Sequence, residues 1–328
     1  MEKIDFIIPW VDGADEKWIE EKRKYVTIND DQEEKKRYRD WDNLQYWFRG
    51  VEKFAPWVNK VHFVTWGHIP KWLNVNHPKL NIVNHADYIP EKYLPVFSSH
   101  PIELNFHRIE GLAEKFVYFN DDTFLTDLTK PADFFSNGLP NSMVVLCPNI
   151  CRMDSFSKAI TNDLAIINKH FGKTDILKNK NKILSIKNGW RVIMSVMMFP
   201  YLGYTGLITT HLPNAYLKST FKEIWEKEPE ILDVTCNHRI RNILDVNQYL
   251  MKYWQIASGK FNPVNEEKIG KYFQIGRDDK LIEKNIKEQR YKMICLNDVD
   301  DSVDFEVEKK FIKRVFDTIF LEKSKFEK

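Results

Sequence analysis

Glycine is scarce in this sequence: only 12 of the 328 residues are Gly, well below the usual share of about 7%. Neither GxGxxG nor GxxxxGK occurs, so the two common glycine loops that hold phosphate groups are excluded. A phosphate ligand of this protein must therefore be held by side chains, a metal ion or helix ends.

Cysteine and long apolar runs are scarce too. The four cysteines, at positions 147, 151, 236 and 295, follow neither zinc-site nor disulfide-framework spacing, which predicts reduced thiols. No run approaches the roughly 18 apolar residues that span a bilayer, and Asp5 and Pro9 interrupt the apolar N-terminus. We therefore expect a cytoplasmic protein, either free or peripheral at the inner face of the plasma membrane.

An excess of one charge is also missing. The chain has 49 Lys and Arg against 47 Asp and Glu, a net charge of +2, so we expect no nucleic-acid partner. Hydrophobic residues make up 43% and aromatic residues 14% of the chain, which predicts a packed core.

Strand-like and helix-like patterns alternate over the first 125 residues, which is typical of an α/β protein. We expect strands over 4–9, 60–65, 80–83, 115–119, 143–146 and 294–296. We expect helices over 44–51, from 99 onward, and over 192–199, 213–227, 238–254 and 311–320. The predicted fold is Rossmann-like, with a mostly parallel sheet flanked by helices. Residues 1–128 and 206–328 would form the catalytic part, and 129–205 a largely helical insertion or cap.

Polar residues follow three of the predicted strands. They are Asp12-Gly13, Asn120-Asp121-Asp122 and Asn297-Asp298. Each group alone is an ordinary turn sequence. However, open parallel sheets bind ligands at the carboxyl ends of their strands, and carboxylate oxygens suit Mg²⁺ together with phosphate oxygens. The coincidence favours a divalent-cation site at this edge.

Two further groups of residues are candidates for a catalytic or binding role. Glu103, His107 and Glu110 would share one face of the helix that starts near Ser99. His211 would lie just before a helix N-terminus, a natural place for an anion, although a lone His is more often structural.

Basic residues lie at the start of one predicted helix and along one face of another. Arg239 and Arg241 would begin the helix over 238–254, and an Arg fork matches phosphate oxygens, although basic residues on helices usually face solvent. The basic face of the last helix, including Lys309 and Lys313, can contact anionic lipid.

Four blocks in order connect these residues to a known family. They cover residues 4–15, 37–125, 211–241 and 295–298, and include Pro9-Trp10-Val11-Asp12-Gly13, Phe119-Asn120-Asp121-Asp122, His211-Leu212-Pro213 and Cys295-Leu296-Asn297-Asp298. The chain resembles the Stealth family of sugar-1-phosphate transferases. That family includes bacterial capsular and exopolysaccharide phosphotransferases and the animal GlcNAc-1-phosphotransferase. A short chain without extra modules is similar to the bacterial branch.

The resemblance implies a GT-A-like variant of the α/β fold and a specific reaction. A hexose-1-phosphate would pass from a UDP-sugar to a hydroxyl of a glycan acceptor carried on a lipid. A phosphodiester would form and UMP would leave. The resemblance leaves the sugar, the acceptor and the oligomeric state open.

The resemblance also assigns residues. The family's catalytic Glu, Asp, His and Arg fall on Glu103, Asp122, His211 and Arg241. His211, or alternatively Glu103, would be the general base, and Arg241 would clamp the diphosphate.

The remaining site residues follow from these roles. Asp122, with Asp121 or Asp298, would hold Mg²⁺ or Mn²⁺. Substrate contacts would come from Trp10, Asp12, Gly13, Arg108 and Arg239.

Two other functions fit the same residues. A metal-dependent glycosyltransferase would use the same UDP-sugar but react at the anomeric carbon and release UDP. A carbohydrate-binding subunit of a polysaccharide assembly complex would use the many aromatic rings and catalyse nothing.

Overall fold

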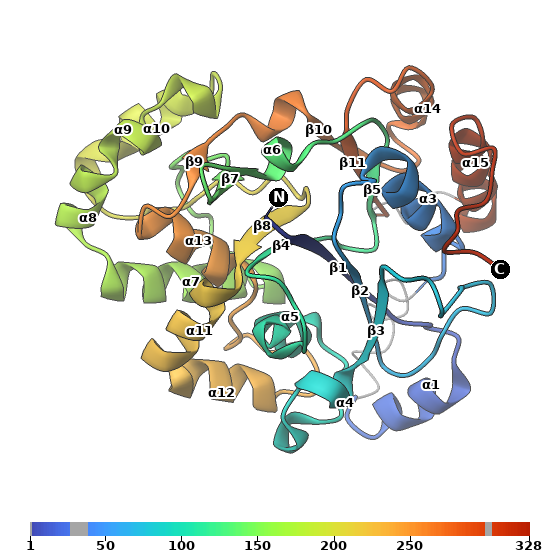
Figure 1. The fold of residues 1–328 in the computed structure, drawn as a ribbon. Helices are drawn as coiled ribbons and strands as arrows, with labels where there is room; N and C mark the ends of the chain where they lie inside the picture. Colours follow the sequence, from blue (N-terminus) through green and yellow to red (C-terminus); the bar gives the residue numbers. More distant parts are fainter. Residues whose placement is uncertain (1, 27–38, 299–303) are drawn as a thin grey trace.

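The computed structural model describes residues 2–26, 39–298 and 304–328. Its centre is a five-stranded sheet in the order β3-β2-β1-β4-β8 (Figure 1). The strands are β1 (Ile4–Trp10), β2 (Val61–Thr65), β3 (Leu80–Asn84), β4 (Lys115–Tyr118) and β8 (Asn214–Leu217). Strands β1 to β4 run parallel, and β8 runs antiparallel to β4. The expected mostly parallel α/β fold is confirmed.

Both faces of this sheet are buried. Successive residues of a strand point to opposite faces, so Ile7 and Tyr118 belong to one apolar layer, whereas Phe6 and Val117 belong to the other. This explains why the strands read as continuous apolar runs rather than as alternating patterns.

Helices cover each face (Figure 1). The layer that contains Ile7 is covered by α4 (His85–Tyr88), α5 (Ser99–Leu104), α7 (Ser155–His170), α11 (Lys218–Lys227), α12 (Pro229–Asn237) and α13 (Tyr249–Ala257). The opposite layer is covered by α3 (Leu44–Phe54), α14 (Asp279–Lys287) and α15 (Phe305–Asp317). Helix α1 (Glu16–Arg23) follows β1.

The described residues also form two smaller sheets and several short 3-10 helices. One three-stranded sheet contains β10 (Gly270–Gln274), β11 (Met293–Asn297) and β5 (Thr123–Leu125); the other contains β6 (Phe135–Ser136), β7 (Leu139–Ser142) and β9 (Asn262–Pro263). Short 3-10 helices are η1 (Glu91–Tyr93), η2 (Phe106–Arg108), η3 (Ile186–Asn188), η4 (Phe199–Tyr201) and η5 (Glu266–Lys268).

The middle of the chain is mostly helical, as expected. After α6 (Pro131–Phe134) and α7 come α8 (Lys173–Lys178), α9 (Lys180–Ile183) and α10 (Val192–Met198). Buried residues of α7, α8 and α9 join the same apolar layer as Ile7. The division into a catalytic part and an insertion over 129–205 stays a prediction.

Two expected elements are wrong. Residues 143–146 form no strand and contribute only an isolated bridge between Leu146 and Leu207. The predicted helix over 213–227 begins with strand β8 instead, because residues 214–217 pair with β4 and alternate between the two layers.

Two helices also end or begin elsewhere than expected. Helix α5 stops at Leu104, where the Asn105 side chain donates to the carbonyl of Pro101, so Glu103, His107 and Glu110 do not share a helix face. Residues 238–248 precede α13 in a loop rather than a helix, because Asp245 accepts from the N–H of Asn242 and closes a turn.

All four cysteines are free, as expected. Among the described residues, no helix has both the length and the apolar character that crossing a membrane requires.

Candidate active site

The order of the main sheet reverses between β1 and β4. The chain continues from β1 to β2 and β3 on one side, whereas β4 pairs with β1 on the other. Open α/β sheets bind ligands at such a switch point, beyond the carboxyl ends of the strands. Asp12 and Gly13 follow β1 there, and Asp121 and Asp122 follow β4.

Strand β8, which is antiparallel to β4, and strand β11, which is antiparallel to β5, bring further residues to this edge. Strand β8 begins with Asn214 opposite Tyr118, so His211 precedes it at the end of the sheet where Asp121 lies. The N–H of Leu296 donates to the carbonyl of Asp122 (2.9 Å), so β11 also ends here. The predicted convergence of the two Asn-Asp sequences is therefore present in the fold.

Tyr118 links Glu103 to the end of β4. Its hydroxyl lies 2.9 Å from Glu103 Oε1 and 2.5 Å from Asn120 Oδ1. Glu103 is buried, and burial raises its pKa, although the nearby positive charge of Arg241 and the Tyr118 hydrogen bond act in the opposite direction. Glu103 is thus a buried carboxyl group that faces the site through Tyr118.

Arg241 lies on the loop before α13 and contacts α5. Its Nη2 donates to Ser99 Oγ (3.3 Å). Buried Asp245 holds this loop in place, since it accepts from His100 Nδ1 (2.9 Å) and from His238 Nδ1 (2.6 Å). The loop therefore presents Arg241 beside Glu103.

Asp122 is an unusual carboxylate. Cys295 Sγ donates to its Oδ2 (3.3 Å), and its buried Oδ1 has no hydrogen-bond partner among the described residues. Burial and the neighbouring charge of Asp121 raise the pKa of Asp122 to about 7. The surrounding protein also raises the pKa of Asp121 to about 6 through desolvation. Among the described residues, desolvation outweighs the hydrogen bonds that lower the pKa of each of these carboxyl groups.

A divalent cation fits this donor set. Mg²⁺ in enzymes is typically held by one or two carboxylates and completed by substrate phosphate oxygens. The described residues include no group of three His, Cys, Asp or Glu that could hold a metal, so a cation here would need ligands from the substrate. Asp298 is placed at the same edge, and its Oδ2 lies 3.7 Å from Arg39 Nη1.

His211 has a left-handed backbone with φ of 51°, a conformation that costs free energy for any residue other than glycine. Its ring lies against Tyr272 (5.6 Å between centroids) and Phe156 (6.0 Å). Burial, followed by the charge of Lys252, lowers the pKa of His211. The imidazole is therefore neutral at pH 7 and able to accept a proton.

The residues of block 4–15 that are expected to contact the nucleotide, Trp10, Asp12 and Gly13, lie at the end of β1. Trp10 stacks on Phe63 (5.8 Å between centroids). The N–H of Asp12 donates to His68 Nε2 (2.9 Å). Gly13 is half-buried beside them.

Arg108 and Arg239 were also expected to contact the substrate, but their hydrogen bonds are made to other parts of the protein. Arg108 donates to Asn105 Oδ1 (3.0 Å) and covers the ring of Trp225. Arg239 donates to the backbone carbonyls of Lys92 and Tyr93 in η1. Of the candidate arginines, only Arg241 influences Glu103 directly.

Sequence reasoning missed several residues of this site. Tyr249 is buried at the start of α13, and the charges of Glu103 and Asp122 both add to the effect of burial in raising its pKa. Lys252 is buried and donates to Asn214 Oδ1 (2.8 Å). A lysine within a helix gives no sequence signal of burial, whereas Tyr118 stands two residues before Asn120 and could have been noticed.

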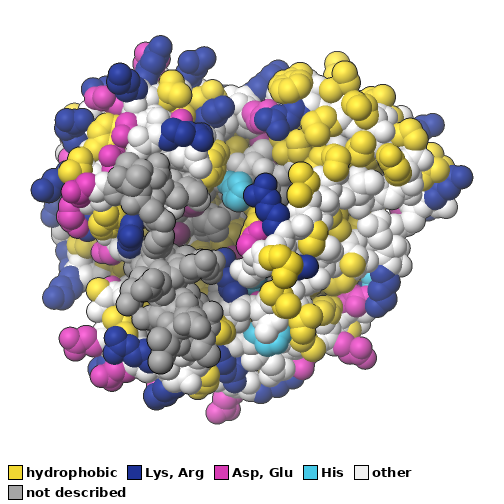
Figure 2. All heavy atoms as spheres, turned by 180° about the vertical axis from the view of Figure 1, so that it is seen from behind, with side chains coloured by type: hydrophobic (Ala, Val, Ile, Leu, Met, Phe, Trp, Pro, Cys, Tyr) yellow, Lys and Arg dark blue, Asp and Glu magenta, His cyan; other side chains and the backbone are white. Residues whose placement is uncertain are grey.

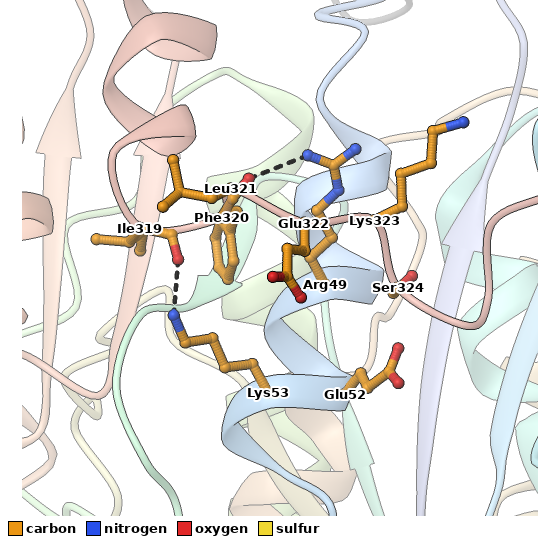
Figure 3. A pocket seen from close by; sticks show the side chains of 9 residues that line it. All are labelled: Arg49, Glu52, Lys53, Ile319, Phe320, Leu321, Glu322, Lys323 and Ser324. Carbon is orange, nitrogen blue, oxygen red and sulfur yellow. Dashed lines mark hydrogen bonds between the residues drawn. The ribbon is translucent and has the colours of Figure 1, made fainter.

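A surface cavity of about 470 Å³ lies elsewhere, between α3 and the segment after α15 (Figure 3). Lys53 Nζ donates to the carbonyl of Ile319 (2.8 Å), and Arg49 donates to the carbonyl of Phe320 (3.2 Å). Arg49 also pairs with Glu327 (2.8 Å). None of the predicted site residues lines this cavity. Two basic side chains that line it, Arg49 and Lys53, already bind carbonyl or carboxylate oxygens of the protein.

Conserved regions of one family match the N-terminal part of the chain. Conserved region 1 of the Stealth proteins matches residues 2–30, and conserved region 2 matches residues 37–142. These segments include Glu103 and Asp122, whereas His211 and Arg241 lie outside them. The second match also includes residues 129–142 of the expected insertion.

Relatives match over the whole chain. The capsular polysaccharide phosphotransferase WcwK of Streptococcus pneumoniae is 42% identical and covers 100% of this chain and 99% of its own. The receptor polysaccharide phosphotransferase WefC of Streptococcus oralis is 42% identical, with 100% of both chains covered. The exopolysaccharide phosphotransferase cps2G of Lactiplantibacillus plantarum is 36% identical, with 99% and 96% covered. Among solved structures, the galactosyltransferase LgtC matches with a TM-score of 0.38 at 10% identity and covers 96% of each chain.

Proposed function

Because this chain belongs to the Stealth family of phosphotransferases, we propose that it transfers a hexose-1-phosphate from a UDP-sugar to a hydroxyl of a glycan acceptor. The product is a phosphodiester link in a capsular or other cell-surface polysaccharide, and UMP is released. The observation that carries this proposal is the placement of Glu103, Asp122 and His211 around one switch point of the sheet.

The reaction begins with the acceptor hydroxyl. Neutral His211 takes its proton, and the oxygen attacks the phosphorus that carries the sugar. The bond between that phosphorus and the bridging oxygen of UMP breaks, so UMP leaves with the electron pair. His211 is the proposed base rather than Glu103, because Glu103 is buried against Tyr118.

Arg241 and Glu103 have supporting roles in this proposal. The guanidinium of Arg241 binds the diphosphate and stabilises the charge on its non-bridging oxygens. Glu103 positions Arg241 by its charge, and positions Asn120 through Tyr118. Trp10, Asp12 and Gly13 lie beside the nucleotide.

Asp122, together with Asp121 or Asp298, would hold Mg²⁺ or Mn²⁺. The cation would neutralise negative charge on the diphosphate, which is the main electrostatic demand of phosphoryl transfer. The Oδ1 of Asp122, which has no hydrogen-bond partner among the described residues, supports this assignment.

The acceptor is proposed to be a glycan on a lipid carrier at the cytoplasmic face of the membrane. Residues 129–205 would contact it and determine its identity. The names of the relatives, which refer to capsular, receptor and exopolysaccharides, support a polysaccharide acceptor.

The experiment is product analysis with the purified protein. A panel of UDP-sugars, Mg²⁺ or Mn²⁺ and an oligosaccharide acceptor pool would be incubated and the nucleotides separated by anion exchange. We expect UMP that appears only with acceptor and disappears in Asp122→Asn and Arg241→Ala. Release of UDP would instead establish a glycosyltransferase, and sugar binding without any nucleotide product from a complete acceptor pool would favour a binding subunit.

A further inference from the structure

Helix α10 and the turns around it present an apolar stripe to solvent. Ile193, Val196 and Met197 are exposed and spaced at i, i+3 and i+4. Trp190 precedes this stripe by one turn, and Tyr201 continues it by one turn. Trp190 is 75%, Met197 65% and Tyr201 73% exposed.

The other side of α10 is fixed to the protein. Ser195 is buried and its Oγ accepts from the N–H of Leu146 (2.9 Å), while Met198 and Phe199 pack against the core. A surface helix normally turns its apolar stripe inward, so the outward stripe of α10 is the reverse of what packing alone produces. We call this surface the α10 patch; it consists of Ile186, Trp190, Ile193, Val196, Met197 and Tyr201.

Hydrophobic side chains gather visibly on this side of the molecule. In Figure 2 they form a broad area at the upper right, the side on which α8 to α10 lie, with Lys and Arg side chains among and beside them. Large contiguous apolar areas on a protein surface mark interaction sites.

The segment that carries the patch is strongly basic. Residues 173–201 contain six Lys or Arg and one acidic residue, Asp175, in a chain whose net charge is only +2. Lys182 donates to the carbonyl of Phe261 (2.8 Å), and Arg191 pairs with Glu267 (3.0 Å). The other four are exposed: Lys173, Lys178, Lys180 and Lys187.

We propose that the α10 patch docks on an anionic lipid bilayer. An apolar helix face with tryptophan and tyrosine at its ends, flanked by exposed lysines, is the arrangement that lies in the membrane interface. The lysines complement the negative surface of the cytoplasmic leaflet. This proposal stands on the patch itself and does not depend on the proposed reaction.

The basic face of α15 is less suited to this role. Lys309 donates to the carbonyl of Asp40 (2.8 Å), and Lys313 pairs with Asp42 (2.5 Å). Glu306 and Glu308 lie on the same helix. The α15 residues therefore serve as the internal comparison for the α10 patch.

The experiment is co-sedimentation of the full chain with lipid vesicles. We expect binding to vesicles that contain about one third phosphatidylglycerol, weaker binding at high salt, and little binding to pure phosphatidylcholine. The double variants Trp190→Ser/Met197→Ser and Lys180→Glu/Lys187→Glu should each weaken binding by about tenfold or more. These side chains are exposed, so both variants should keep the wild-type circular dichroism spectrum and Tm.

Matched controls change other exposed residues, on α14 and α15. Leu281→Ser/Val307→Ser removes apolar side chains from α14 and α15, and Lys310→Glu reverses a charge on α15. Both should bind vesicles like the wild type. The proposal is overturned if the α10 variants bind vesicles like the wild type, or if only the α15 variants lose binding. It is also overturned if the wild type forms a dimer that does not bind vesicles and the α10 variants dissociate that dimer into monomers.

Discussion

His211 has an unusual backbone conformation and a buried ring. Its backbone is left-handed, and its ring sits between Tyr272 and Phe156 with a lowered pKa. A strained residue persists only where its surroundings fix it. At the end of the sheet where Asp122 lies, this geometry suits a base that must stay neutral near pH 7.

We expect His211→Ala to lower the rate of acceptor-dependent UMP release by about 10²- to 10⁴-fold, the usual contribution of a general base. Because burial lowers the pKa of His211, the wild-type rate should stay level at pH 7 and decline only below the ordinary histidine value of 6.5. Steady-state rates between pH 5 and 8 measure both effects.

The control for this substitution is His77→Ala. Burial lowers the pKa of His77 as well, but His77 stacks on Phe326 near the C-terminus, so its loss should leave the rate unchanged. A His211→Ala protein with the wild-type rate would remove His211 as the base and favour Glu103.

At the scale of elements, the loop before α13 depends on one carboxylate. Asp245 is fully buried and ties His238 and the N–H of Asn242, both in this loop, to His100 on α5. Arg241 lies between these contacts. In the proposed mechanism, Asp245 is therefore a positioning residue for Arg241 rather than a catalytic one.

Asp245→Asn should lower kcat/KM for the UDP-sugar by about 10- to 100-fold, because a small displacement of a positioned group is costly in catalysis. The loss should appear mainly in KM, since Arg241 is the residue proposed to bind the diphosphate. Asp233→Asn is the matched control: Asp233 lies on the neighbouring helix α12 and pairs with exposed Lys92. Equal kinetics for the two variants would contradict the positioning role.

Helix α3 approaches β5 closely at Gly50. A Cβ atom there would lie 2.8 Å from the carbonyl oxygen of Leu125, a backbone atom that cannot swing away. Alanine is favoured over glycine in a helix by about 1 kcal/mol, whereas overpacking costs about 1–3 kcal/mol.

Gly50→Ala should therefore lower the free energy of unfolding, measured by urea denaturation, despite its better helix propensity. Gly172→Ala is the control, because no heavy atom of the described residues lies within 4 Å of its added Cβ. A Gly50→Ala protein more stable than the wild type would show that α3 can move away from β5 at little cost.

The sequence predicted the elements whose signal is local. Strands β1, β2 and β4 are mostly buried on both faces and are bounded by turn residues, so their apolar runs were recognisable. Strand β8 was missed because its four residues lead directly into α11, and a short strand has no periodicity of its own. The loop over 238–248 was missed because Asp245 finds its partner His100 at a distance of 145 residues along the chain.

At the scale of the whole molecule, the core contains a carboxylic acid with an unsatisfied oxygen. Asp163 on α7 is fully buried, and its Oδ2 has no hydrogen-bond partner among the described residues. Burial raises the pKa of Asp163 well above 3.8. The folded protein therefore keeps this proton at pH values where the unfolded chain has lost it.

The stability that Asp163 contributes is present at low pH and is lost as the pH rises above about 4. Asp163→Asn mimics the protonated acid, so it should raise the Tm at pH 8 and change it less at pH 5. Asp154→Asn, at the start of the same helix, should not raise the Tm, because the hydrogen bond from the Ser157 N–H lowers the pKa of Asp154. An Asp163→Asn protein less stable than the wild type at pH 8 would show that the carboxylate is ionised and paired.

The candidate site was predictable where it follows strands. Asp12, Asp121, Asp122 and Asp298 stand directly after strand signals, and parallel strands must end at a common edge. Tyr118, Tyr249 and Lys252 were not predicted, because their part in the site arises from tertiary contacts. The family resemblance, rather than spacing, selected His211 and Arg241.

In the proposed reaction, the phosphorus atom that bears the sugar is transferred to the acceptor together with the sugar. The most direct measurement uses a UDP-sugar labelled with ³²P at that phosphorus, incubated with the enzyme and acceptor. A phosphotransferase moves the label into the glycan and releases unlabelled UMP. Label that remains in the nucleotide as UDP, while the sugar appears on the glycan, would contradict the account and establish transfer at the anomeric carbon.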